Sequence, residues 1–174
     1  MQIDKHRPPH LYFNNQIYFL TVKCYKGAPF FKNKEKFVSE ILDKTIKEFN
    51  YDLYAWVILE NHLHLLLKIE KEFRKFIRIF NGRIAYKINK LDGLANRRVI
   101  YQYWDRCMRN ESDFWKHFNY IHNNPIKHGY IRNPDKLYLY KFSSYKTWLK
   151  RYGEKWLISC FAQYPIIDFS LPDD

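Results

Sequence analysis

Two histidines one residue apart, together with a tyrosine and an asparagine farther along the chain, are the residues whose spacing could do chemistry. His62 and His64 lie in the run HLHLLLKIE (62–70), which is typical of a β-strand, so both imidazoles are expected on the same face of a sheet. Two neutral imidazoles on one face form half of a divalent-metal site. The spacing alone is weak, because an exposed strand can also carry two histidines for no chemical reason.

The tyrosine and the asparagine belong to the segment YIHNNPIKHGY (120–130), at the end of a predicted helix. Tyr120 and Asn124 are four residues apart, which is about one helical turn, so the phenol and the amide project side by side. We expect them near an edge of the helix, because its apolar residues, Phe114, Phe118 and Ile121, are predicted to face the core. The segment is also compatible with an ordinary helix end, since Asn-Pro often terminates helices.

Together the two segments permit phosphodiester chemistry. A phenol is a poor nucleophile at neutral pH because its pKa is about 10. A divalent cation bound by His62, His64 and the amide oxygen of Asn124 would polarise the phosphate oxygens, while Tyr120 would be held close to the phosphorus. In-line attack would give a covalent phosphotyrosine and conserve the energy of the broken bond for rejoining.

Composition favours a folded protein with a polyanionic partner. The 174 residues include 30 Lys plus Arg against 18 Asp plus Glu, a formal net charge of +12, and 20% are aromatic. A disordered basic tail is excluded, because a chain with this many rings can bury a core. Nucleic acid and an anionic membrane surface both remain possible partners on charge alone. We expect no membrane span, no secretory leader and a cytoplasmic location, with the three separated cysteines as reduced thiols.

The positive charge is concentrated in residues 71–109, where eleven Lys or Arg face three acids. Tyr101, Tyr103 and Trp104 interleave with these cations, a mixture that single-stranded nucleic acid uses for phosphate neutralisation and base stacking. A solvated helix face and a core role for the rings are the competing interpretations. The predicted DNA-binding residues are Arg74, Lys75, Arg78, Arg83, Lys87, Arg97, Arg98, Arg106, Lys127, Lys141 and Lys146.

The elements that must position these residues follow the order β-α-β-β-α-β-α. Strands are predicted at 16–25, 52–60, 62–70 and 97–104, and helices at 33–49 with Asn33 as N-cap, at 73–88, and from about 112 to the break at Pro125. This order predicts an α+β, ferredoxin-like fold with an antiparallel sheet covered by helices. We expect one domain over 1–174, with a core at about 16–128 and a C-terminal extension at about 129–174 whose one helical stretch is 145–152.

The paired motifs NHLHLLL (61–67) and YIHNNPIKHGY (120–130) resemble the signature of single-tyrosine HUH transposases, most closely the REP-associated tyrosine transposase branch. The similarity spans roughly residues 6–150 and includes YQYWDR and FSSYKTW. It implies that His62 and His64 are metal ligands, that Asn124 completes the site, and that Tyr120 forms a 5′-phosphotyrosine on single-stranded DNA. It also implies Mg²⁺ or Mn²⁺ and a hairpin-bearing DNA partner. Glu60 departs from the family pattern, which often has proline there.

The leading hypothesis is therefore a metal-dependent enzyme that cleaves and rejoins single-stranded DNA at a hairpin through Tyr120. A non-catalytic nucleic-acid-binding protein of the same fold is the first alternative, since the same charge and rings support it. A metal-dependent phosphoesterase for small substrates fits the histidines but leaves the +12 charge unexplained. Both a monomer and a homodimer are compatible with the sequence, and no membrane partner is expected.

Overall fold

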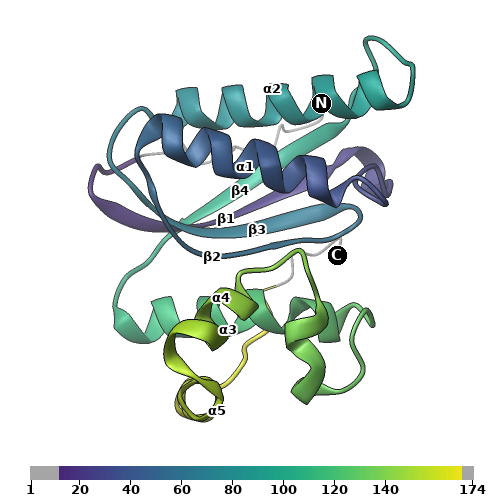
Figure 1. Cartoon of the computed structure of the whole chain (residues 1–174). Coiled ribbons are helices and arrows are strands. Elements are labelled where there is room, and N and C mark those ends of the chain that lie inside the picture. Colours follow the sequence, from purple (N-terminus) through teal and green to yellow (C-terminus); the bar gives the residue numbers. More distant parts are fainter. Residues whose placement is uncertain (1–11, 170–174) are drawn as a thin grey trace, which may run out of the picture.

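The computed structural model describes residues 12–169 and contains a four-stranded antiparallel sheet between two layers of helices (Figure 1). The strands are β1 (Gln16–Cys24), β2 (Asp52–Ile58), β3 (His62–Ile69) and β4 (Ile100–Cys107), and the longer helices are α1 (Glu35–Phe49), α2 (Phe73–Leu91) and α3 (Glu111–Lys127). Their order along the chain, β-α-β-β-α-β-α, confirms the fold class expected from the sequence.

The strands lie in the order β2-β3-β1-β4, and every neighbouring pair is antiparallel. Two central strands, β1 and β3, are apolar along most of their length because helices cover both of their faces. The β2–β3 hairpin turns at Glu60 and Asn61, as predicted, and Glu60 forms an ion pair with Lys32 at 3.6 Å.

Each face of the sheet has its own hydrophobic core. Helices α1 and α2 cover one face and bury, among others, Val38, Leu42, Phe76 and Phe80. The other face packs against α3, with Phe118 and Ile121 meeting Leu66 of β3. Figure 1 shows these helices on opposite sides of the strands, so residues of α2 and residues of α3 are separated by the sheet.

Residues after α3 add a short 3₁₀ helix (Pro134–Leu139) and two further helices, α4 (Tyr145–Tyr152) and α5 (Glu154–Gln163), on the α3 side. Helix α4 matches the predicted stretch, whereas α5 was not predicted. Its burial is limited to Leu157 and Cys160, too few apolar positions to form a clear stripe in the sequence. None of the helices in residues 12–169 combines the length and apolar character that a bilayer span requires.

Three predicted boundaries were wrong. Asn33 is not the N-cap of α1: it has a left-handed backbone with φ 62°, and the helix begins after Lys34. The fourth strand runs over 100–107 rather than 97–104, so Arg97 and Arg98 precede it. Helix α3 passes through Pro125 to Lys127, since proline removes only its own N–H donor and His128 still donates to the Asn124 carbonyl at 3.0 Å.

Candidate active site

The two site histidines lie side by side on the α3 face of the sheet. Strand β3 places His62 and His64 on the same face, with ring centroids 5.0 Å apart and with only 5% and 1% of their surfaces exposed. The ring of His128, just after α3, lies 4.9 Å from that of His62. The period of two in a strand therefore brings the imidazoles of His62 and His64 together, as the sequence predicted.

Asn61 fixes the orientation and the tautomer of His62. The Asn61 Nδ2 donates to the Gly27 carbonyl at 3.2 Å, which turns its Oδ1 toward the Nδ1 of His62 at 2.7 Å. An amide oxygen can only accept a hydrogen bond, so Nδ1 of His62 carries the proton. The lone pair is then on Nε2, which is the arrangement of a metal-ligating histidine whose second nitrogen is held by another residue.

Burial keeps His64 neutral. Its Nδ1 lies 2.8 Å from the Thr21 hydroxyl on β1, and its Nε2 is buried without a hydrogen-bond partner. Desolvation lowers the pKa of His64 well below its usual value, and the nearby His62, His128 and Lys127 lower it further. A neutral imidazole with an uncommitted nitrogen is chemically suited to bind a metal.

Helix α3 brings Tyr120 against His64 and carries Asn124 one turn farther along. The Tyr120 ring centroid is 5.3 Å from that of His64, and the two residues of α3 lie one turn apart. Asn124 donates through Nδ2 to the Tyr120 carbonyl at 2.8 Å, while its Oδ1 is buried without a partner. The expectation that these side chains lie near an edge was wrong, since 2% of Tyr120 and none of Asn124 is exposed.

Tyr120 is covered in part by residues near the C-terminus of the described chain. The ring of Phe169 lies 5.4 Å from that of Tyr120 and stacks on His117 at 3.8 Å. Asp168 accepts a hydrogen bond from the Nζ of Lys127 at 2.7 Å. Lys127 in turn lies 5.3 Å from the centre of the Tyr120 ring. Burial alone would lower the pKa of Lys127, but Asp168 and Tyr120 raise it overall.

The donor atoms fit a divalent ion bound by two imidazoles and an amide oxygen. Within residues 12–169, no three His, Cys, Asp or Glu side chains have the arrangement of a metal site. Asn124 offers a donor of another type, an amide oxygen. The buried, partnerless Oδ1 of Asn124 and Nε2 of His64 are atoms whose desolvation an ion would compensate.

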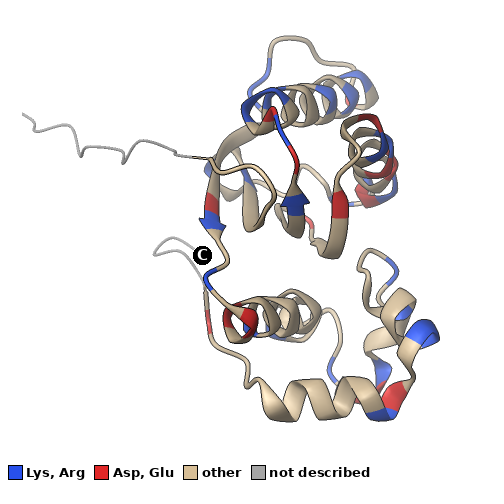
Figure 2. Cartoon of the chain, turned by 90° about the vertical axis from the view of Figure 1, so that its left-hand side faces the viewer, with Lys and Arg blue, Asp and Glu red and all other residues tan. Residues whose placement is uncertain are grey.

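The predicted DNA-binding cations do not all lie near these residues. Helix α2 has six Lys or Arg and no acid, but it covers the opposite face of the sheet, so Arg74, Lys75, Arg78, Arg83 and Lys87 are separated from Tyr120 by the strands. In Figure 2, α2 carries blue residues at the top of the molecule, while α1 beside it carries both red and blue. Most of the charge in residues 71–109 thus cannot contact a phosphate at Tyr120 directly.

Several of these cations are also paired with carboxylates. Such pairs include Lys75–Glu72, Arg83–Glu48, Arg97–Asp92, Arg106–Asp113 and Lys127–Asp168. Lys141 and Lys146 are exposed on the α3 side, just before α4 and within it. Of the rings among these cations, Tyr103 packs into the α1–α2 core, whereas Tyr101 is 46% exposed and Trp104 is half-buried.

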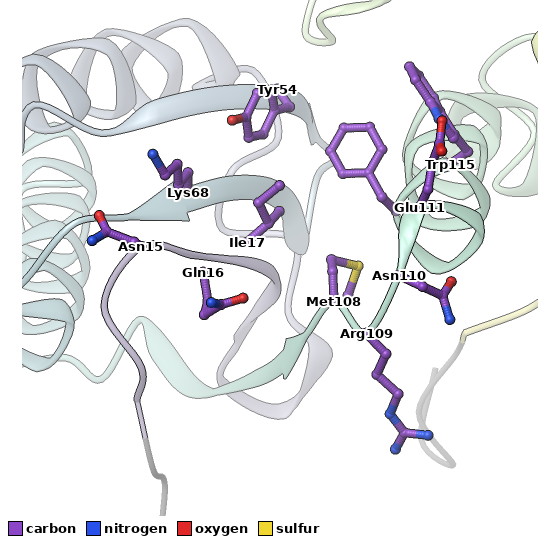
Figure 3. Close-up of a pocket in the computed structure, with 11 residues that line it drawn as sticks. Asn15, Gln16, Ile17, Tyr54, Lys68, Met108, Arg109, Asn110, Glu111 and Trp115 are labelled. Atoms are coloured by element: carbon purple, nitrogen blue, oxygen red, sulfur yellow. The ribbon is translucent and has the colours of Figure 1, made fainter.

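A cavity of about 520 Å³ opens elsewhere, between the start of β1 and the start of α3 (Figure 3). Its lining combines Tyr54, Phe114 and Trp115 with Lys68 and Arg109. Glu111 at this cavity accepts a hydrogen bond from the Trp115 indole at 3.2 Å. None of the two site histidines, Tyr120 or Asn124 lines it, so this cavity is distinct from the candidate active site.

The topology of the sheet and the contact of the paired histidines with a helical tyrosine agree with the resemblance to single-tyrosine HUH transposases. Residues 12–123 match the family of IS200-like transposases, and the chain belongs to this family. The match includes His62, His64 and Tyr120 and ends one residue before Asn124.

Individual relatives agree with this assignment. The chain is 24% identical over 124 residues to a REP-associated tyrosine transposase of Escherichia coli strain K12, covering 70% of this chain and 73% of the relative. It is 28% identical over 100 residues to a putative REP-associated tyrosine transposase of Haemophilus influenzae, covering 51% and 57%. A solved REP-associated tyrosine transposase bound to a REP hairpin has the same fold, with a TM-score of 0.69, 21% identity, and 86% and 87% coverage.

Proposed function

We propose that the protein is a metal-dependent endonuclease and strand transferase that cleaves and rejoins single-stranded DNA near a hairpin. The observation that carries this proposal is the contact between the Tyr120 ring and His64, in a chain that belongs to a transposase family. The side chains of Tyr120, His64 and Asn124 are all buried, and a phenol, imidazoles and an amide oxygen are groups that metal-assisted attack on a phosphodiester uses.

In this reaction the Oη of Tyr120 attacks the phosphorus, and the bond from phosphorus to the 3′-oxygen of the preceding nucleotide breaks. The phosphate stays joined to tyrosine as a 5′-phosphotyrosine, and the leaving oxygen takes a proton to become a 3′-hydroxyl. Lys127, close to the Tyr120 ring, is suited to stabilise negative charge on the phenolate and on the phosphate. Attack by a 3′-hydroxyl on the phosphotyrosine reverses the step and rejoins a strand.

A divalent ion, when bound, supplies the Lewis acid that polarises the non-bridging phosphate oxygens. His62, His64 and Asn124 would hold it, and Asn61 and Thr21 would orient the two imidazoles. Two imidazoles and an amide oxygen are softer than the ligand set that Mg²⁺ usually has, which favours Mn²⁺ as the supporting ion of the two.

The hairpin is proposed from the relatives, one of which is described as bound to a REP hairpin. The net charge of +12 supports a nucleic-acid substrate. We place the reaction in the bacterial cytosol or nucleoid, where such DNA is available, and treat residues 1–174 as one domain that acts as a monomer or a homodimer.

The test is an incubation of the protein with a 3′-labelled hairpin oligonucleotide and Mn²⁺, followed by denaturing electrophoresis, because a 5′-phosphotyrosine retains the 3′ part of the cleaved strand. We expect a labelled band that migrates with the protein, lost in Tyr120→Phe and in His64→Ala. The matched control is Tyr152→Phe on α4, an exposed tyrosine outside the cluster, which should keep the band. An adduct that survives Tyr120→Phe would disprove the assignment of the nucleophile. Binding without an adduct in any divalent ion would support the non-catalytic alternative.

A further inference from the structure

A strip of aromatic rings and cations lies at one end of β4. The rings of Tyr25, Tyr101 and Trp104 follow one another, with centroids 6.2 Å apart for the first pair and 6.4 Å for the second. Three cations lie over these rings at 5.0–5.5 Å from their centres. We call the six residues the aromatic strip: Lys23, Tyr25, Lys26, Arg98, Tyr101 and Trp104.

The strand register places two residues of the strip, Lys23 and Trp104, on the same face as the site histidines. Trp104 pairs with Thr21, whose hydroxyl bonds to His64, and Lys23 pairs with His62. Paired residues in an antiparallel sheet project to the same face. Two interstrand spacings separate Trp104 from His64 along the sheet, which is about 10 Å. Helix α3 packs mainly over β2 and β3. On β1 and β4, α3 and Phe169 contact Phe19 and its strand partner Arg106, and the strip lies farther along the same two strands.

Arg98 is held in position over the rings. Its Nη2 donates to the Tyr101 carbonyl at 2.9 Å, while the guanidinium carbon lies 5.0 Å from the Tyr25 ring centre and 5.4 Å from that of Tyr101. Across residues 12–169, neither Arg98 nor Lys26 forms an ion pair with a carboxylate. This differs from Arg83 and Arg97, which are both paired with acids.

One exposed ring, that of Tyr101, and two half-buried rings beside cations match the chemistry of single-stranded DNA. A ring face stacks on any base that is not already stacked, and the cations neutralise the phosphates that follow. A duplex would offer phosphates only, because the faces of its bases are covered by their neighbours. We propose that the aromatic strip binds bases of the single strand that adjoins the scissile phosphate. The scissile phosphate is taken from the proposed function, whereas binding of the strand can be tested without it.

The experiment measures binding by fluorescence anisotropy in the Tyr120→Phe background with a chelator present, so that no cleavage is possible. Two labelled DNAs are compared: a hairpin with a single-stranded flank, and the same hairpin with blunt ends. Stacking of one base contributes enough that Tyr101→Ala should weaken binding of the flanked DNA roughly tenfold. Binding of the blunt hairpin should stay unchanged, which also shows that the variant is folded.

Arg98→Ala should lower the slope of binding against salt concentration by about one ion, whereas Tyr101→Ala should leave that slope unchanged. The matched control is Tyr86→Ala on α2, an exposed tyrosine with Lys90 over its ring at 6.0 Å, on the opposite face of the sheet. Its affinity for both DNAs should equal that of the parent. Equal loss for flanked and blunt DNA, or no loss for flanked DNA in Tyr101→Ala, would overturn the proposal. An absent phosphotyrosine adduct would instead count against the proposed function alone.

Discussion

Replacement of Asn61 by alanine should weaken metal binding without removing a metal ligand. In the folded protein the Oδ1 of Asn61 accepts from Nδ1 of His62 at 2.7 Å, and His62 is only 5% exposed. Water has little access to replace this bond, which stabilises the ring by about 1–1.5 kcal/mol. Residues that orient a ligating histidine typically change metal affinity by about 10–100-fold. We therefore expect the Kd for Mn²⁺ to rise by about that factor in Asn61→Ala.

The assay is a Mn²⁺ titration followed through the electron paramagnetic resonance signal of the free ion. In Asn61→Ala, adduct formation should be lost at low Mn²⁺ and restored at saturating Mn²⁺, since the proposed metal ligands themselves remain. Asn61→Asp is the control: it keeps an oxygen acceptor for His62 and should retain affinity within a few-fold. Unchanged Mn²⁺ affinity in Asn61→Ala, together with lost affinity in His62→Ala, would refute the orienting role.

Three further outcomes can be measured. Burial lowers the pKa of His122 to about 3. On acidification, His122 therefore takes up a proton in the unfolded state at a higher pH than in the folded state. The free energy of unfolding is not reduced by this proton uptake above about pH 6.5, and it falls by about 2 kcal/mol at pH 5. Urea unfolding should show this loss in the parent and a shallower pH dependence in His122→Gln. Phe169→Ala removes a ring that covers Tyr120 and should speed adduct formation roughly fivefold in a time course, because about 1 kcal/mol of ring packing no longer opposes exposure of Tyr120; a slower reaction would contradict this. Lys127→Ala should slow adduct formation at saturating DNA more than tenfold, whereas Arg78→Ala, on the opposite face, should change it less than threefold.

The fold could be predicted because its signals are local. The short, largely apolar run of β3 and the three- and four-residue spacing of Phe73, Phe76, Ile77 and Phe80 in α2 indicate the type and order of the elements. Element boundaries were less certain: Asn33 has the side chain of an N-cap but a left-handed backbone. Helix α5 escaped prediction because its stability comes from tertiary contacts, such as the stacking of Trp156 on Trp148 at 5.7 Å.

The components of the site could be predicted from spacing, but their surroundings could not. The period of a strand places His62 beside His64, and the helical turn places Tyr120 beside Asn124. That Thr21 bonds to His64 depends on the register between β1 and β3, and no residue in the sequence specifies it. Phe169 lies 49 positions after Tyr120, beyond the range of any local pattern. The charge of α2 lay next to the histidines in sequence, yet the sheet separates them in space.

The ring contact between Tyr120 and His64 joins two residues of the same polypeptide. One chain therefore contains every group that the proposed cleavage requires. The rate of cleavage per molecule should therefore be independent of protein concentration. An inactive His64→Ala chain mixed with an inactive Tyr120→Phe chain should also fail to restore activity, because neither could lend its intact half to the other. Dilution and mixing would thus reveal whether catalysis is a property of a single molecule.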